Sequence, residues 1–155
     1  MDKIICIMLA GGKGKRMGTD ISKQYLMLND KPVLYYSLKA FEPYVDEIII
    51  VAAKGEEKYC YKEIVEKYAV NKVSKIVTGG AERYLSVYEG LKAVESESLT
   101  ESRYVLIHDG ARPFVDKEII ERVICKVKEC KACIAAVPSK DTVKTVDEKG
   151  IVLNT

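Results

Sequence analysis

The sequence predicts an α/β domain in which a doubly wound, mostly parallel β-sheet is covered by helices on both faces. Short apolar runs of strand type alternate along the chain with amphipathic segments about three helical turns long, a pattern typical of such sheets. Polar clusters follow the apolar runs, where sheets of this kind bind their ligands. A length of 155 residues, of which 48% are hydrophobic, suffices for one packed domain.

The first predicted element is a strand over residues 4–7, and a glycine-rich loop follows it at residues 8–18. Glycines let a backbone approach phosphate closely while basic side chains neutralise its charge, so the loop predicts a nucleotide site. It lacks the Gly-Lys-Ser/Thr ending of a Walker loop, and Met17 fills the third glycine position of the dinucleotide motif. A flexible basic turn is the alternative, but the cations Arg16 and Lys23 favour phosphate binding.

The next segments continue the alternation. A turn at residues 29–32 precedes a predicted helix over residues 33–41. Residues 47–52 are apolar nearly throughout, as a strand buried on both faces is. The helix expected next, over residues 56–68, has an apolar face at i, i+3, i+4 and i+7, formed by Tyr61, Ile64, Val65 and Tyr68.

Residues 75–77 predict a short strand, and the turn Thr-Gly-Gly-Ala-Glu-Arg at residues 78–83 leads into a helix that ends near Val94. We expect the inward face of this helix to consist of Tyr84, Val87, Tyr88 and Leu91.

Residues 104–108 predict another buried strand, which ends in the cluster Asp-Gly-Ala-Arg-Pro at residues 109–113. Asp116 is a suitable N-cap for the next helix. That helix has an apolar face made of Ile120, Val123, Ile124 and Val127, and a further strand is expected at residues 132–137.

The end of the chain departs from this alternation. Residues 142–146 and 151–153 have strand character and flank the turn Asp-Glu-Lys-Gly at residues 147–150, which predicts a β-hairpin. We expect this hairpin to project from the sheet as an arm that begins at about residue 139.

Charge and composition exclude several classes of function. The net charge of +2, from 25 basic and 23 acidic side chains, leaves no broad positive field for nucleic-acid binding. No apolar stretch is long enough to cross a bilayer, and the N-terminus lacks a signal-peptide pattern. Five cysteines, an odd number scattered through expected core and helix positions, favour reduced thiols and a cytoplasmic protein.

Cys130 and Cys133 form a C-x-x-C pair, for which a redox site or half of a zinc site is the alternative to a structural role. A reactive cysteine pair usually lies at a helix N-terminus, which lowers the pKa of the thiol, whereas these two cysteines are predicted at the end of a helix and the start of a strand. Zinc needs further ligands, and the chain has a single histidine. A structural role is therefore favoured.

Four clusters in order resemble the 2-C-methyl-D-erythritol 4-phosphate cytidylyltransferase family, namely residues 9–17, 79–87, 108–114 and 141–144. The first is shared with many nucleotidyltransferases, whereas the second and third together are specific to this group and its ribitol-5-phosphate relatives. The resemblance covers the whole chain. It implies a Rossmann-like sheet of the nucleotidyltransferase type, with a projecting β-hairpin arm. It also implies a single domain over residues 1–155 that is incomplete at its C-terminus.

The resemblance implies transfer of a cytidylyl group from CTP to 2-C-methyl-D-erythritol 4-phosphate, with release of pyrophosphate, in isoprenoid precursor biosynthesis. It also implies Mg²⁺ as cofactor and a homodimer joined through the arm. The attacking phosphate monoester is already an anion at neutral pH, so the reaction needs no general base. The obstacle is repulsion between anions, which positioned cations overcome.

The family pattern also implies roles for individual residues. Arg16 and Lys23 match its catalytic cations, and Asp109 matches its metal ligand. Asp109, Arg112 and Thr142 match the sugar-phosphate positions. The nucleotide-binding positions correspond to Ala10, Gly11, Gly12, Gly14, Gly79, Gly80, Ala81 and Ser86.

Each of these residues also has a simpler interpretation. Arg16 and Lys23 are of a type usually found as solvated surface cations, and Asp109 suits a turn cap. His108 is expected to point to the opposite face from Asp109 and to be structural. Ser22 stands where the family pattern has proline before the lysine.

A second departure concerns Tyr84-Leu85, which replaces the more common glutamine followed by a polar residue, so contacts from these two side chains are not carried over. The chain also stops before a second catalytic lysine of the family, so we expect it to be inactive or weakly active. Two alternatives stay open: a ribitol-5-phosphate cytidylyltransferase, and a nucleotide-binding protein without catalysis.

Overall fold

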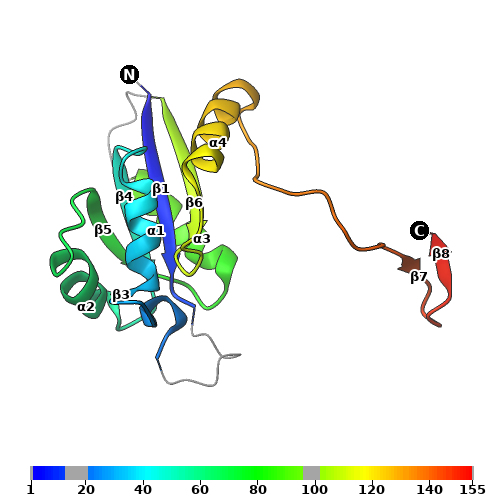
Figure 1. Ribbon diagram of the computed structural model, residues 1–155, viewed down its shortest axis with the longest axis horizontal. Coiled ribbons are helices and arrows are strands. Elements are labelled where there is room, and N and C mark those ends of the chain that lie inside the picture. Colours follow the sequence, from blue (N-terminus) through cyan, green and yellow to red (C-terminus); the bar gives the residue numbers. More distant parts are fainter. Residues whose placement is uncertain (1, 13–20, 96–101, 155) are drawn as a thin grey trace.

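The structure is a computed structural model that describes residues 2–12, 21–95 and 102–154. At its centre lies a four-stranded parallel sheet in the order β5-β4-β1-β6 (Figure 1). The predicted α/β fold with a parallel sheet is confirmed. The strands are β1 (Lys3–Ala10), β4 (Glu47–Ala52), β5 (Val73–Thr78) and β6 (Arg103–Asp109).

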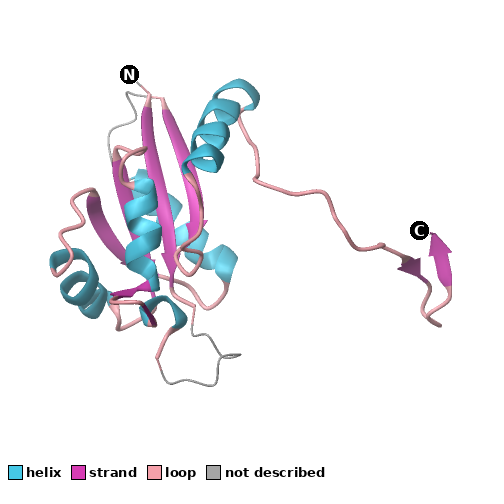
Figure 2. Cartoon of the chain, viewed as in Figure 1, coloured by secondary structure: helices cyan, strands magenta, loops and turns pink. Residues whose placement is uncertain are grey.

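Helices cover both faces of this sheet (Figure 2). One face, which carries Cys6 and Met8 of β1, packs against α1 (Val33–Phe41), α2 (Glu57–Cys60), its π-helical continuation η3 (Tyr61–Glu66), and α4 (Lys117–Cys130). The other face, with Ile5 and Ile7, packs against α3 (Arg83–Glu95). Alternate residues of β1 thus belong to two separate cores, as strands of a doubly wound sheet require.

The prediction for the inward face of α3 was wrong in part. Tyr84 and Tyr88 are 69% and 57% exposed. The buried positions are Ser86, Gly90 and Val94, which are four residues apart. A Cβ on Gly90 would come within 2.6 Å of Ile7 Cγ2, so the helix lies too close to the sheet for a large side chain at this position. The close approach of α3 to the sheet therefore places Ser86 and Gly90 on its inward face, and the two tyrosines lie on its outer face.

Two strand predictions also need correction. Residues 104–108 form part of β6, but only Leu106 of this strand is buried, and Ile107 is 44% exposed. Residues 132–137 are not a strand: they run as extended chain away from the sheet (Figure 1), with Ile134 and Val137 87% and 86% exposed. An apolar segment becomes a strand only beside a partner strand, and none of the described residues pairs with this one.

Helix α4 begins as the sequence predicts. The Asp116 carboxylate accepts a 2.7 Å hydrogen bond from the backbone N–H of Ile119 and so caps the helix. Ile120 and Val127 are buried, while Val123 and Ile124 are partly buried against the same core. At 14 residues, α4 is the longest helix in the described ranges. None of these helices combines the length and the apolar run that crossing a bilayer needs.

The remaining elements are short. A 3₁₀ turn, η2 (Lys23–Tyr25), precedes an antiparallel pair, β2 (Met27–Leu28) and β3 (Lys31–Pro32). The predicted hairpin is confirmed as β7 (Thr145–Val146) and β8 (Val152–Asn154), at the far end of an extended tail (Figure 1). Its turn is closed by Asp147, whose carboxylate accepts from two backbone N–H groups, and Gly150 supplies the positive φ of +80°.

Candidate active site

The carboxyl ends of the four parallel strands lie at one edge of the sheet, which we call the carboxyl edge. The register places Ala10 of β1 beside Ala52 of β4, and Ala52 beside Thr78 of β5. On the other side of β1, Leu9 pairs with Asp109 of β6. Three of the four polar clusters that the sequence singled out therefore begin at this edge, where parallel sheets bind their ligands.

The loop after β1 leaves the sheet with little steric crowding. A Cβ on Gly11 would meet only ordinary contacts, 3.5 Å from the backbone N of Ala53, and one on Gly12 would meet nothing within 4 Å. Among the described residues, packing therefore does not require these two glycines, and the close approach to a ligand stays a prediction. Gly14 and Arg16 lie outside the described residues.

Packing does require the glycines that follow β5. A Cβ on Gly79 would lie 2.8 Å from the hydroxyl of Ser86, and one on Gly80 would lie 2.3 Å from Leu85 Cβ. The Ser86 hydroxyl is buried and donates to backbone carbonyls, at 3.2 Å to Glu82 and 3.4 Å to Gly80. These hydrogen bonds of Ser86 therefore fix the start of α3. Ala81, which lies between Gly80 and the helix, is exposed.

Lys23 lies on η2, directly beside the end of β1. Its neighbour Gln24 is 2% exposed and donates through Nε2 to the carbonyl oxygen of Ala10. Lys23 itself is exposed. The fold thus anchors the turn at the carboxyl edge and leaves the Lys23 side chain exposed.

Asp109 lies at the tip of β6 between two arginines. Its Oδ1 accepts from Arg83 Nε at 3.1 Å and Nη2 at 2.9 Å, and its Oδ2 is 3.1 Å from Arg112 Nε. The Asp109 side chain is 31% exposed, whereas those of the two arginines are 64% and 77% exposed. The cluster has two positive charges and one negative, so it attracts an anion.

Sequence reasoning did not name Arg83 as a site residue. Its position after the Gly-Gly turn was the available signal, because a residue that starts the helix after β5 must lie at the carboxyl edge. The structure adds the contact with Asp109, which joins the turn after β5 to the tip of β6.

Thr142 is not brought to the carboxyl edge. It lies in the extended tail between α4 and β7, which runs away from the sheet (Figure 1). Val143 next to it is 69% exposed, so this part of the tail is not packed on its own domain.

His108 points away from Asp109, as the alternation of side chains along a strand predicts. Its ring packs on Phe41 of α1, with ring centroids 4.7 Å apart, and its Nε2 is 3.0 Å from the carbonyl oxygen of Arg112. Burial lowers the pKa of the imidazole from its ordinary value of 6.5. His108 therefore supports the turn after β6 as a neutral ring.

This lowered pKa predicts how stability depends on pH. Below pH 6.5 the unfolded chain binds a proton at His108 more readily than the folded one. The histidine's contribution is therefore complete above 6.5 and is lost as the pH falls from 6.5 through the folded pKa. We expect the free energy of unfolding to fall further in the wild type than in His108→Gln between about pH 7 and about pH 5, in urea titrations. Equal losses would contradict this assignment.

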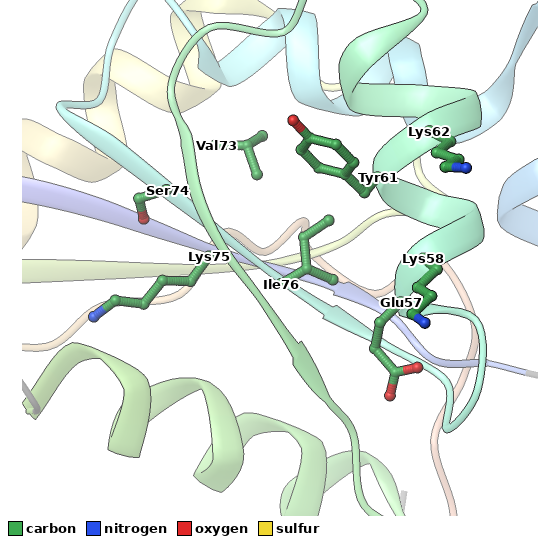
Figure 3. A pocket seen from close by; sticks show the side chains of 8 residues that line it. All are labelled: Glu57, Lys58, Tyr61, Lys62, Val73, Ser74, Lys75 and Ile76. Carbon is green, nitrogen blue, oxygen red and sulfur yellow. The ribbon is translucent and has the colours of Figure 1, made fainter.

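The cavity in Figure 3 lies elsewhere, with β4 and β1 between it and β6. Its volume is about 320 Å³, and Lys75 points out of it toward α3, where its ammonium donates to Ala93 O at 2.9 Å. We assign it no role in the site. Its lining comes from α2, η3 and β5, namely Glu57, Lys58, Tyr61, Lys62, Val73, Ser74, Lys75 and Ile76.

All five cysteines are unpaired, as the sequence predicts. Burial raises the pKa of the Cys60 thiol to about 12 and also raises that of Cys6. Cys130 ends α4, and Cys133 lies in the extended segment beyond it, so the pair has no helix N-terminus to activate it. In the described part of the chain, no three His, Cys, Asp or Glu side chains gather into a metal site.

Comparison with known proteins identifies the family of this chain. Residues 4–155 match the family model described as 2-C-methyl-D-erythritol 4-phosphate cytidylyltransferase. The chain belongs to this family. Among curated relatives with that description, one from Lachnoclostridium phytofermentans is 51% identical over all of this chain and one from Alkaliphilus metalliredigens is 49% identical over 99% of it. The chain spans 65% and 63% of their respective lengths.

Solved structures agree with this assignment to the cytidylyltransferase family. The structure of 4-diphosphocytidyl-2C-methyl-D-erythritol synthase from Anaerococcus prevotii is 35% identical, with a TM-score of 0.81, and the match covers 99% of this chain and 64% of that one. Another synthase structure described in the same way is 25% identical, with a TM-score of 0.74. The Rossmann-like fold is therefore shared with these cytidylyltransferases over nearly the whole chain.

Proposed function

We propose that this chain carries the nucleotide half of a cytidylyltransferase site, which transfers a cytidylyl group from CTP to 2-C-methyl-D-erythritol 4-phosphate. One observation carries the proposal: the turn of Lys23 and the cluster around Asp109 both adjoin the last residues of β1. Gln24 donates to Ala10 O, and the backbone N–H of Gly110 donates to Leu9 O at 2.8 Å. Positive side chains from separate parts of the sequence therefore lie on segments that adjoin the carboxyl edge, where we expect the nucleotide to bind.

The chemistry follows from charge. The attacking sugar phosphate is an anion at neutral pH, and the α-phosphate of CTP is another, so the transition state gathers negative charge. The Lys23 ammonium on its anchored turn stabilises that charge, and Arg112 binds the sugar phosphate after leaving Asp109. Neither residue has to move a proton, which suits a site whose histidine packs as a neutral ring against Phe41.

Asp109 fits the role of a magnesium ligand. Mg²⁺ binds proteins through one or two carboxylates and takes its other ligands from substrate phosphates and water. Asp109 is a partly exposed carboxylate at the carboxyl edge. Its Oδ1 accepts two hydrogen bonds from Arg83, whereas its Oδ2, among the described residues, contacts only Arg112 Nε and keeps a lone pair that can bind an ion. When bound, the ion neutralises triphosphate charge. Arg83 then remains close enough to Asp109 to hold the carboxylate in place.

A second copy of the chain completes the proposal. Thr142 lies on a tail that does not pack on its own domain, and Val143, Ile134 and Val137 beside it are exposed apolar residues. Such a tail gains stability by packing against another subunit, where Thr142 would reach that subunit's carboxyl edge. The free thiols suit a reducing compartment, so we place the reaction in the cytoplasm.

Calorimetric titration with CTP, in the presence and absence of Mg²⁺, tests the nucleotide site. We expect binding that Mg²⁺ strengthens by about tenfold or more, and we expect Asp109→Asn to remove this enhancement without unfolding the protein. Asp116→Asn is the matched control. Asp116 caps α4 at the far end of the turn after β6, and asparagine also caps helices, so this variant should leave the Mg²⁺ enhancement unchanged.

Pyrophosphate release then tests transfer. We expect release with 2-C-methyl-D-erythritol 4-phosphate and not with ribitol 5-phosphate, at a slow rate because Thr142 can reach a carboxyl edge only in a second copy of the chain. A preference for ribitol 5-phosphate would support the other cytidylyltransferase. CTP binding without release from either substrate would support the non-catalytic alternative, and absence of CTP binding would overturn the proposal.

A further inference from the structure

The turn that carries Lys23 is tied down on both sides of the lysine. On one side, the Ser22 hydroxyl donates a 2.8 Å hydrogen bond to Glu56 Oε1, which lies 34 residues away in sequence. On the other, Gln24 and Tyr25 are buried at 2% and 8% exposure. Lys23 is the exposed residue between these anchors, so the backbone that presents it has little freedom.

The backbone at Ser22 has the geometry of a proline. Its φ is −58° and its ψ is 134°, and a pyrrolidine ring would fix φ near this value. Serine has no ring and visits many other conformations at little cost, so another interaction must hold it here. The contact with Glu56 is the one side-chain hydrogen bond that the structure gives Ser22 within the described residues.

Glu56 is suited to hold this serine. It lies at the N-cap of α2, where its backbone N–H donates to Ala53 O at 2.9 Å and its carbonyl accepts from Cys60 N at 2.8 Å. The backbone that carries the carboxylate is therefore fixed. Its Oε2 is buried and makes no hydrogen bond within the described residues, although the Tyr25 hydroxyl interacts electrostatically with this carboxylate. The side-chain hydrogen bond that the geometry gives Glu56 there is the one from Ser22. A hydrogen bond to a charged acceptor is stronger than a neutral one.

We propose that Ser22 and Glu56 are positioning residues, whose hydrogen bond restricts the turn before Lys23 and so holds the lysine ammonium at the carboxyl edge. The bond performs the task that a proline ring would perform at residue 22. The effect on CTP rests on the proposed function, whereas the ordering of the turn does not depend on it. The two parts can therefore be tested separately.

The first test measures amide hydrogen exchange in the full chain by NMR. The N–H of Tyr25 donates to Ser22 O at 2.8 Å, and that of Leu26 donates to Lys23 O at 3.3 Å, so both amides report on closure of the turn. We expect Ser22→Ala and Glu56→Ala each to speed their exchange about 5- to 10-fold. The amide of Ile48, which donates to Lys72 O in the core, serves as the reference and should not change.

The double variant S22A/E56A decides whether the two residues act through one bond. We expect its exchange to match that of either single variant, because the bond can be lost only once. Ser22→Thr, which keeps a hydroxyl, and Ser22→Pro, which fits the observed φ, should both restore slow exchange. Glu56→Gln keeps an acceptor and should fall between the wild type and Glu56→Ala. Additive effects of the two alanines would overturn the proposal.

The second test asks whether the effect reaches the nucleotide through Lys23. Calorimetry should show that Ser22→Ala weakens Mg²⁺·CTP binding about 3- to 10-fold when Lys23 is present. The same substitution should have no effect when it is added to the Lys23→Ala variant. Equal weakening in both backgrounds would contradict positioning of Lys23. If the wild-type chain does not bind CTP at all, the proposed function fails, and the exchange experiment alone decides the role of Ser22 and Glu56.

Discussion

Alanine at Lys23 is expected to slow cytidylyl transfer by about 10²- to 10³-fold, the usual cost of removing one group that stabilises transition-state charge. Lys23 lies on a turn bonded to the end of β1, and the proposal places the α-phosphate beside it. Single-turnover pyrophosphate release with excess protein is the measurement, because it needs one transfer event per nucleotide. The free energy of unfolding should stay within about 0.5 kcal/mol, since the side chain is exposed.

Lys128→Ala is the matched control for this experiment. Lys128 is another exposed lysine, and its ammonium is 3.9 Å from a carboxylate oxygen of Asp2, which precedes β1, so it lies at the opposite edge of the sheet. Its loss should change the rate less than about twofold, as a surface substitution away from the site does. If Lys23→Ala lowers the rate by no more than Lys128→Ala does, Lys23 is a solvated surface cation and the assigned role is wrong.

The second large effect is expected in the core between the sheet and α3. Ile7 is 0% exposed, and replacing it with alanine should lower the free energy of unfolding by about 2–5 kcal/mol. Gly90→Ala should lower it by about 1–3 kcal/mol, because the new methyl group would meet Ile7 Cγ2 at 2.6 Å and Val51 Cγ2 at 3.2 Å. Urea unfolding, followed by circular dichroism, measures both values.

The double variant I7A/G90A should lose less stability than the sum of its parts, by about 1 kcal/mol or more, because the cavity left by isoleucine accepts the methyl group. Gly12→Ala is the control for the glycine substitution, since its Cβ would meet nothing within 4 Å. We expect it to change stability by less than about 0.5 kcal/mol. If the stability losses of the two single variants add up to that of the double variant, Gly90 is needed for the backbone conformation of α3 and not for the close packing of the helix on the sheet.

Local sequence pattern predicted most of the fold. The run at residues 47–52 is buried at every position in β4, and Asp116 caps α4 through the contact that its residue type favours. Both features depend on neighbours within a few residues, so the sequence contains the information. Tyr84 and Tyr88 were placed wrongly because helical periodicity finds an apolar stripe but not the distance to the sheet. Gly90 sets that distance through its contact with Ile7.

The placement of the polar clusters at the ends of the strands was predicted to a similar extent. Glycines and cations after β1, β5 and β6 could be assigned to one edge, since parallel strands end together. The strand predicted at residues 132–137 was wrong because strand-forming residues alone do not make a strand. A partner strand must also lie beside them. Thr142 follows this segment in the extended tail, and the tail runs away from the sheet for the same reason (Figure 1).

The amino-acid sequence by itself determined the alternation of strands and helices and the family to which the chain belongs. It also determined that its unusual polar clusters follow strands. Only the tertiary structure decided which side chains meet there: Arg83 with Asp109, and Ser22 with Glu56. These pairs are 26 and 34 residues apart, so their contacts depend on strand register and on how each helix lies on the sheet. Short-range patterns do not carry that information.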